Sequence, residues 1–282
     1  MPRLIHRAAH MAFRIFPPLK RWDYLVNGLK SRFHPVDEEI QVRLLGDRKM
    51  IINPADGVSY EIYMRGCYEH DTLQQVRKLL WPGMTFFDIG AHFGQFTLVG
   101  AAAVEEKGAV HSFEPGPIQF DFLTRNVKLN DLDNATLNNM ALGEEEGEMG
   151  FVVPSLRDLG QSHLAFRGPG TRTVKVTTLD HYCEEHGIKS IDVMKVDVEG
   201  AEMQVFRGAS GLLANFPPAA IFYESIDILN KNFGHTSAEM HDLLESYGYV
   251  VNVLRGRKFV PVSPGERDGH SDFVALRPHG SV

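Results

Sequence analysis

The sequence predicts an α/β protein with a mostly parallel sheet that carries helices on both faces. Apolar, strand-like runs alternate with helix-like segments from residue 85 to residue 247. The first of these runs, residues 85–89, enters a turn with two glycines, Gly90 and Gly94, and continues as a helix-compatible segment. Polar residues follow several of the strands, and ligands of open α/β sheets bind beyond the carboxyl ends of the strands.

The composition excludes several classes of protein. The 282 residues are 43% hydrophobic and 23% charged, as in ordinary globular proteins. A net charge of −7 argues against a dedicated nucleic-acid binder. Cys67 and Cys183 lie far apart without metal-ligand spacing, so we expect two buried thiols in a cytoplasmic protein, with no disulfide framework and no metal site. No apolar run reaches the ~18 residues of a membrane span.

The chain divides into three regions. Residues 1–34 carry seven basic residues against one acid, Asp23. They could form an amphipathic helix on an anionic membrane surface, or a helix that packs on its own domain. Residues 35–81 predict a small β/α cap element, with strands near 40–44, 50–52 and 60–63 and a helix over 71–81. Residues 82–282 form the main domain. The oligomeric state cannot be read from the sequence.

Within the main domain, strands are predicted over 109–113, 135–141, 150–153, 191–196, 219–223, 249–254 and 273–276. Helices are predicted over 117–130, 179–186 and 236–247. Thr177 or Thr178 begins the second helix, and a capping box of Thr236 and Glu239 begins the third. The last two strands favour an antiparallel strand at one edge. Residues 154–173 are rich in glycine, proline and arginine, which predicts a lid, a binding loop or a surface insertion.

The turn after residue 89 narrows the choice of ligand. A dinucleotide-binding loop reads G-x-G-x-x-G, whereas this turn has Gly90 and Gly94 behind Asp88. A carboxylate there repels a pyrophosphate but can hold a cationic or hydroxyl-bearing ligand. S-adenosylmethionine, with a sulfonium, an ammonium and a ribose, suits this turn better. The alternative is an ordinary glycine-rich connection without a ligand.

Three further strand-end positions carry acids or a histidine. Glu114 follows Gly94 by twenty residues, where a carboxylate can accept both ribose hydroxyls, although it could instead serve the next helix N-terminus. Asp197 and Glu199 could accept a proton from an acceptor or hold the donor's amino group, or they could cap a helix. His92 could act as a base or be a structural hydrogen-bonding residue. Glu224 and Asn139 belong to the same set of strand ends.

Three ordered motifs resemble the FkbM family of methyltransferases. They read D-I-G-A-H-F-G over residues 88–94, F-E-P over 113–115 and M-K-V-D-V-E-G-A-E over 194–202. The resemblance runs from about residue 40 to residue 278. It implies a class I, Rossmann-like methyltransferase fold, with a seven-stranded sheet whose last strand is antiparallel. It also implies S-adenosylmethionine as the cofactor and methyl transfer, commonly to oxygen, on sugars or on polyketide- and glycolipid-type compounds.

The resemblance carries a set of site residues with it. Donor contacts are expected from Asp88, Gly90, Ala91, His92, Gly94, Thr97, Glu114, Pro115, Asn139, Met140, Ala141 and Asp197. From the residues themselves rather than from the resemblance, catalytic roles are expected from Asp197 and Glu199, ahead of His92. His92 departs from the family pattern, which usually has asparagine at that position.

The sequence therefore predicts a methyltransferase that acts on a hydroxyl of a sugar, a glycolipid or another natural product. The expected partner is a small-molecule or saccharide acceptor, with no nucleic acid, and residues 1–34 could in addition contact a membrane surface. Two alternatives remain open at this stage. One is a nucleotide-dependent oxidoreductase or nucleotide-sugar enzyme, and the other is a non-catalytic, membrane-associated binding module.

Overall fold

The computed structural model describes residues 28, 37–44, 47–153, 155, 159–165, 171–255, 257–267 and 270–278. Its main sheet has eight strands in the order β13-β12-β14-β11-β10-β3-β4-β5. Five neighbouring strands, from β11 to β5, run parallel, while β14 is antiparallel to both β11 and β12. The bounds are β3 (Thr85–Ile89), β4 (Ala109–Phe113), β5 (Ala135–Asn138), β10 (Val193–Val196), β11 (Ala220–Ile226), β12 (Val250–Arg255), β13 (Lys258–Pro261) and β14 (His270–Leu276).

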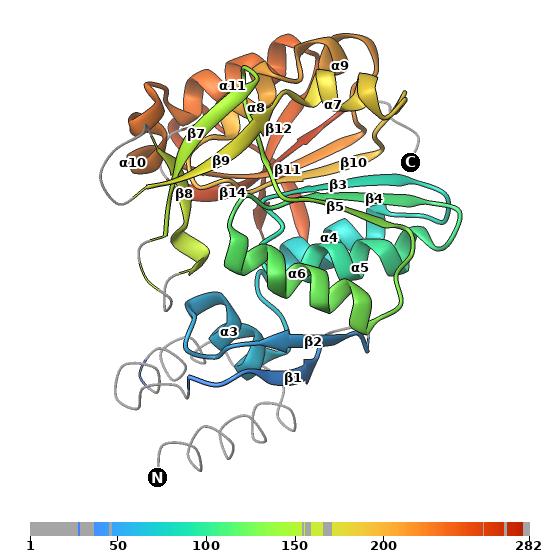
Figure 1. Ribbon diagram of the computed structural model, residues 1–282. Coiled ribbons are helices and arrows are strands. Elements are labelled where there is room, and N and C mark those ends of the chain that lie inside the picture. The colour runs from blue at the N-terminus through green and yellow to red at the C-terminus, as the bar shows by residue number, and fades with distance from the viewer. Residues whose placement is uncertain are drawn as a thin grey trace.

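Helices cover both faces of this sheet (Figure 1). One face carries α4 (His70–Leu79), α5 (Gln95–Val104) and α6 (Pro117–Leu129). The other carries α7 (Leu179–Glu185), α8 (Glu202–Arg207), α9 (Ser210–Asn215) and α11 (Ser237–Ser246). Because side chains alternate along a strand, Phe86 packs in the core on the α5 side and Phe87 in the core on the α7 side.

Two smaller units complete the fold, a four-stranded sheet beside the main sheet and a cap element packed against α6. A four-stranded sheet, ordered β6-β9-β7-β8, consists of β6 (Ala141–Leu142), β7 (Gly147–Val152), β8 (His163–Ala165) and β9 (Arg172–Thr177). The cap element consists of the hairpin of β1 (Ile40–Arg43) and β2 (Lys49–Ile52), followed by α3 (Gly57–Arg65). Short segments complete the chain: η1 (Leu159–Gln161), α10 (Asp227–Asn230), η2 (Lys231–Phe233) and η3 (Pro264–Glu266).

Two asparagines, one within α6 and one at its C-terminal end, hold the cap hairpin in place. The side-chain amide of Asn126 bonds both the N–H and the carbonyl of Ile51 and also donates to the carbonyl of Phe93. One turn later, Asn130 makes the same two-way contact with the backbone of Lys49. These side chains satisfy backbone groups along β2, which anchors the cap beside the β3–α5 turn.

The structure confirms the fold class and refines several elements. The strand over 109–113 and the capping box of Thr236 and Glu239 occur as predicted, and Thr178 is the residue that caps α7. The predicted strand over 60–63 is wrong, because Asp56 caps a helix, α3, that includes those residues. The predicted strand over 135–141 is broken after Asn138, and its end joins the smaller sheet as β6.

The order of the last strands also differs from the expectation. β14 lies between β11 and β12, so the antiparallel edge strand is β13, an eighth strand that was not predicted. The predicted amphipathic segment 1–34 lies outside the described residues, apart from Gly28. Cys67 and Cys183 are free and buried, as expected. No helix within the described ranges has both the length and the apolar character needed to cross a membrane.

Candidate functional site

A cavity of about 970 Å³, measured with its opening to solvent, lies beyond the carboxyl ends of β3, β4, β10 and β11. Residues at these strand ends, including Gly90, Glu114, Asp197 and Glu224, line it. This is the edge at which open α/β sheets bind ligands.

The glycines of the β3–α5 turn are required by the packing of the protein itself. Gly90 has a φ of 84°, and a Cβ at this position would lie 1.7 Å from the carbonyl oxygen of Asp197. Gly94 has a φ of 91°, and its Cβ would lie 2.5 Å from Cδ1 of Leu123. Both positions combine a left-handed backbone with a close neighbour, which only glycine tolerates. Gly90 and Ala91 line the cavity.

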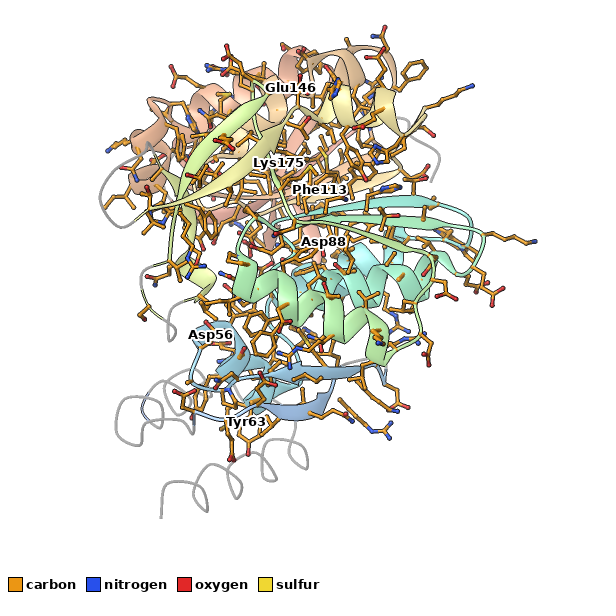
Figure 2. All side chains as sticks on the ribbon, in the orientation of Figure 1. Asp56, Tyr63, Asp88, Phe113, Glu146 and Lys175 are labelled. Carbon is orange, nitrogen blue, oxygen red and sulfur yellow. The ribbon has the colours of Figure 1, made fainter. Side chains whose placement is uncertain are left out.

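Asp88 lies beneath this turn, in the interior between the sheet and its helices (Figure 2). Its Oδ2 accepts a 2.6 Å hydrogen bond from the hydroxyl of Thr97, and that hydroxyl lies 2.8 Å from the hydroxyl of Ser112. Burial raises the pKa of Asp88 to about 6, against the opposing effects of Lys195 and Thr97. Asp88 and Thr97 are therefore used inside the protein and do not line the cavity.

Glu114 faces the cavity from the end of β4. Its Oε2 accepts from the N–H of His92 at 2.8 Å, and its Oε1 accepts from the N–H of Gly116 at 2.7 Å. These two bonds fix the carboxylate, while each oxygen keeps a lone pair for a ligand hydroxyl. Burial raises the pKa of Glu114 to about 7, although both backbone bonds favour the charged form.

The segment after β5 forms the neighbouring wall. Asn139 is exposed, and its amide donates to the carbonyls of Glu114 and Pro115, at 2.8 and 3.3 Å. It therefore joins two strand-end loops and does not line the cavity. Pro115, Met140 and Ala141 do line it, and they form a largely apolar wall next to Glu114.

Three carboxylates gather at the ends of β10 and β11. Asp197, Glu199 and Glu224 each present an oxygen, and these oxygens lie within 4.8 Å of one another. Burial raises the pKa of Glu199 to about 9, and the charges of Asp197 and Glu224 contribute to the rise. The pKa of Glu224 is raised mainly by burial and by the charge of Asp197. The three acids can accept several hydroxyl hydrogens, and their residue types also suit a divalent cation.

Lys195 provides the positive charge beside this cluster. Its Nζ donates to Oδ2 of Asp197 at 2.7 Å, lies 3.9 Å from Oε2 of Glu69, and sits 4.5 Å from the ring centroid of Phe96. Burial alone would lower the pKa of Lys195, but the neighbouring carboxylates of Asp197, Glu69 and Asp88 outweigh burial and raise it. The lysine therefore stays charged.

His92 lies at the wall of the cavity with a left-handed backbone, at a φ of 50°. Its ring stacks on Phe93 with the centroids 4.2 Å apart. Nε2 is buried and has no hydrogen-bond partner among the described residues. Burial lowers the pKa of His92, so the imidazole is neutral near pH 7.

The cap element and the η1 segment close the other side of the cavity. Figure 2 shows Asp56 on the side of the cap that faces the rest of the molecule. The buried Asp56 accepts from the N–H of Ser59 at 2.9 Å and from the N–H of Leu159 at 3.0 Å. Gln119 of α6 donates to the carbonyl of Leu159 and to the hydroxyl of Ser162. The part of segment 154–173 that the structure describes is thus an ordered wall, and the rest of that segment lies outside the described residues.

The predicted site residues separate into two groups. Eight of the expected donor contacts line the cavity: Gly90, Ala91, His92, Glu114, Pro115, Met140, Ala141 and Asp197, joined by Glu199. Asp88, Gly94, Thr97 and Asn139 support the surrounding loops instead. Lys195 and Glu69 were not predicted from the sequence. A lysine within an apolar strand was a usable signal, since a fully buried lysine needs a partner, whereas nothing in the sequence marked Glu69.

Comparisons with known proteins agree with this geometry. Residues 88–251 match the model of the methyltransferase FkbM domain. A relative described as 31-O-demethyl-FK506 methyltransferase FkbM, from Streptomyces tacrolimicus, is 28% identical over 72% of this chain and 81% of its own length. Methyltransferase 1 of Beauveria bassiana is 25% identical over 76% of this chain and 91% of its own. Hexuronic acid methyltransferase AglP of Haloferax volcanii is 29% identical over 51% and 58%, respectively.

The domain match covers more than half of the chain and includes the turn at β3, Glu114 and the carboxylate cluster. It gives no support to the oxidoreductase, nucleotide-sugar or binding-module alternatives. The chain belongs to the FkbM family of methyltransferases, which confirms the predicted enzyme class and S-adenosylmethionine as its cofactor.

Proposed function

We propose that this protein methylates a hydroxyl oxygen of a sugar, a glycolipid or a related small molecule, with the donor and acceptor held next to each other in one cavity. The observation that carries this proposal is the continuity of one cavity from Gly90 and Glu114 to Asp197, Glu199 and Glu224. S-adenosylmethionine supplies an electrophilic methyl group on a sulfonium when it is bound.

The residues around Glu114 suit the donor. The carboxylate of Glu114 is held by two backbone N–H groups and can accept the ribose hydroxyls. Met140 and Ala141 offer an apolar wall for the adenine. Gly90 and Ala91 bring the backbone close to the donor's amino-acid end, and the buried, unpartnered Nε2 of His92 lies in the same wall.

The carboxylate cluster suits the acceptor. Asp197, Glu199 and Glu224 can orient hydroxyl groups by accepting their hydrogens, and an ionised carboxylate can take the proton that the acceptor loses. The new bond joins the acceptor oxygen to the methyl carbon, and the electron pair of the broken carbon–sulfur bond stays on sulfur. Alignment of the two reactants supplies most of the rate enhancement in such a site.

We further propose that the part of residues 35–81 that precedes α4 acts as a cap over the cavity. Met50, Val58, Ile62 and Tyr68 from this segment line the cavity. The names of two relatives, a demethyl-FK506 31-O-methyltransferase and a hexuronic acid methyltransferase, favour a small-molecule or saccharide acceptor with a hydroxyl group. A cytoplasmic location and a membrane contact through residues 1–34 remain proposals from the sequence.

Calorimetry with S-adenosylmethionine tests the donor half. We expect Glu114→Ala to weaken donor binding by about tenfold or more, because it removes charge-assisted hydrogen bonds to the ribose. Glu184→Ala, an exposed acid on α7, serves as the matched control and should bind the donor like the wild type. A thermal melt of each variant separates loss of fold from loss of contact, and Glu114→Gln provides a second variant of the same size. Unchanged donor affinity in a folded Glu114→Ala would overturn the ribose assignment.

A screen of sugar and lipid-linked hydroxyl compounds for release of S-adenosylhomocysteine tests the acceptor half. The wild type should release it with at least one hydroxyl acceptor, and mass spectrometry should place the added methyl on oxygen. A protein that transfers methyl groups only to nitrogen, or to no compound in the panel, would contradict the proposed acceptor class.

A further inference from the structure

The carboxylate cluster contains an ion pair that the proposed function does not yet use. Lys195 is the one lysine or arginine among the described residues that line the cavity, and its side chain is 6% exposed. Its Nζ is 2.7 Å from Oδ2 of Asp197 and 3.9 Å from Oε2 of Glu69. Burying a charged lysine costs free energy even when the charge is paired with carboxylates. Packing alone therefore does not explain why a lysine occupies this position.

Three contacts fix the position of this ammonium. Asp197 holds it from the loop after β10, and Glu69 holds it from the segment that precedes α4. The ring of Phe96, at the start of α5, lies against it with the centroid 4.5 Å away. Lys195 also pairs in register with Asp88 on the neighbouring strand β3, so the same charge balances the buried carboxylate beneath the turn.

The bond to Lys195 distinguishes Asp197 from its neighbours. It engages Oδ2 and leaves Oδ1 to a ligand, and Asp197 lines the cavity with 22% of its side chain exposed. For Glu199 and Glu224, by contrast, burial and the charges of nearby acids raise the pKa, and the opposing effect of Lys195 is smaller. Asp197 is thus the member of the cluster to which Lys195 donates a hydrogen bond.

We propose that Lys195, anchored by Glu69, is a positioning residue that fixes Asp197 as the acceptor of the proton released in methyl transfer. The inference rests on the proposed function. As the acceptor oxygen bonds to the methyl carbon, the electron pair of the broken carbon–sulfur bond stays on sulfur and the hydroxyl proton passes to the Asp197 carboxylate. Asp197 then stays protonated until solvent removes the proton. Glu69 belongs to the cap segment, so the position of the cap and the orientation of Asp197 are linked.

Three variants test the proposal. Lys195→Met removes the charge and keeps an unbranched stem over Phe96. Lys195→Arg keeps the charge, and its longer side chain can still donate to Asp197. Glu69→Gln weakens the anchor while leaving Lys195 in place. Lys128→Met, an exposed lysine on α6, is the matched control.

The measurements are the Kd of S-adenosylmethionine by calorimetry, and kcat and KM with the best hydroxyl acceptor from the screen. We expect Lys195→Met to lower kcat by about 100-fold, within the range of a lost general base, with the donor Kd changed less than about threefold. Lys195→Arg should recover about a tenth or more of the wild-type kcat, and Glu69→Gln should lower kcat by about three- to tenfold.

Wild-type kcat in Lys195→Met would overturn the inference, and so would a loss confined to donor Kd or to KM. If Lys195→Met does not fold, Glu69→Gln decides, because an unchanged kcat in that variant also overturns it. The two proposals fail separately. A wild type that turns over while Lys195→Met matches it refutes the role of Lys195 alone, whereas a wild type without hydroxyl methylation refutes the proposed function.

Discussion

The ends of β3 and of β10 both carry acids in the family motifs, but the protein uses them differently. At the end of β3, Asp88 is buried and bonded to Thr97, and the glycines of the following turn have close neighbours where a side chain would begin. After β10, Asp197 and Glu199 line the cavity, and their carboxylates crowd together with Glu224. At the first end the acid and its hydroxyl partner support the turn from within the protein, and at the second the acids themselves line the cavity.

The difference shows that only some residues of a recognisable motif line the cavity, while others are used inside the protein. The carbonyl of Asp197 lies where a Cβ of Gly90 would be, so the two strand ends are packed directly against each other. Lys195 connects them as well, through its bond to Asp197 and its charge beside Asp88. A substitution at the β3 end should therefore act mainly on stability, and one at the β10 end mainly on turnover.

The largest effect is expected from Gly90→Ala. A methyl group 1.7 Å from the carbonyl oxygen of Asp197 forces β3 and the loop after β10 apart, and it also places alanine at a φ of 84°. We expect a loss of about 4 kcal/mol or more in the free energy of unfolding, measured by urea denaturation. Loss of soluble protein would agree with this expectation.

Gly187→Ala is the matched control for that variant. Gly187 also has a positive φ, 64°, but no atom lies within 4 Å of the point that a Cβ would occupy there. Gly187→Ala should lose only the cost of placing alanine at a positive φ, about 1 kcal/mol in the free energy of unfolding. Equal losses in the two variants would show that the close approach at Gly90 is absent in solution, and the comparison between the strand ends would fail.

A smaller effect is expected from Thr97→Val. The substitution keeps the shape of the side chain but removes the hydroxyl that donates to Asp88 and contacts Ser112. Leaving a buried carboxylate without this donor should cost about 1–3 kcal/mol in the free energy of unfolding, while the donor Kd stays within about twofold of the wild type. Thr124→Val, whose exposed hydroxyl bonds the carbonyl of Phe120, should cost less than about 0.5 kcal/mol.

Calorimetry on the same proteins decides what Thr97 does. A stable Thr97→Val that binds S-adenosylmethionine more than tenfold more weakly would place this side chain at the ligand, as the family resemblance implied. Side chains at the ends of both β3 and β10 would then contact the ligand, contrary to the contrast drawn from the structure.

The sequence predicted the fold class and the main strands because hydrophobic alternation depends on local residue order. The capping box at Thr236 and the ends of α6 follow from the same local chemistry. The helix that contains Tyr60 was missed because aromatic and β-branched residues favour strands. Its N-cap, Asp56, also accepts a hydrogen bond from the N–H of Leu159, a contact far away in the sequence that local patterns do not reveal. The eighth strand, β13, depends on pairing with β12, which single-sequence patterns do not reveal.

The site was predictable to a similar depth. Residues at strand ends could be identified, since the topology brings those ends together. Which side chains line the cavity could not, because Asp88 and Asp197 look alike in sequence and differ only in what packs around them. Glu69 lies outside every motif and reaches the site through the path of the cap segment.

The effect of Glu199→Gln, which is smallest near pH 5, concerns the β10 end and its pH dependence. Burial and the charges of Asp197 and Glu224 raise the pKa of Glu199 from 4.5 to about 9. Between those two pH values the folded protein holds a proton that the unfolded chain releases, so the stability contributed by Glu199 is present below pH 4.5 and declines as pH rises toward 9. Glutamine does not titrate, so the variant should avoid this decline.

Thermal melts should therefore show Glu199→Gln closest to the wild type near pH 5 and increasingly more stable than it as the pH rises to 8.5. Glu184→Gln, an exposed acid on α7, should show no such divergence. The same variant of Glu199 should turn over more slowly if Glu199 orients the acceptor, since a group retained at a cost to stability is expected where the chemistry needs it. If the stability difference between Glu199→Gln and the wild type does not change with pH, the three carboxylates are not close together in solution. The ion pair between Lys195 and Asp197 would then not be needed to balance their charges.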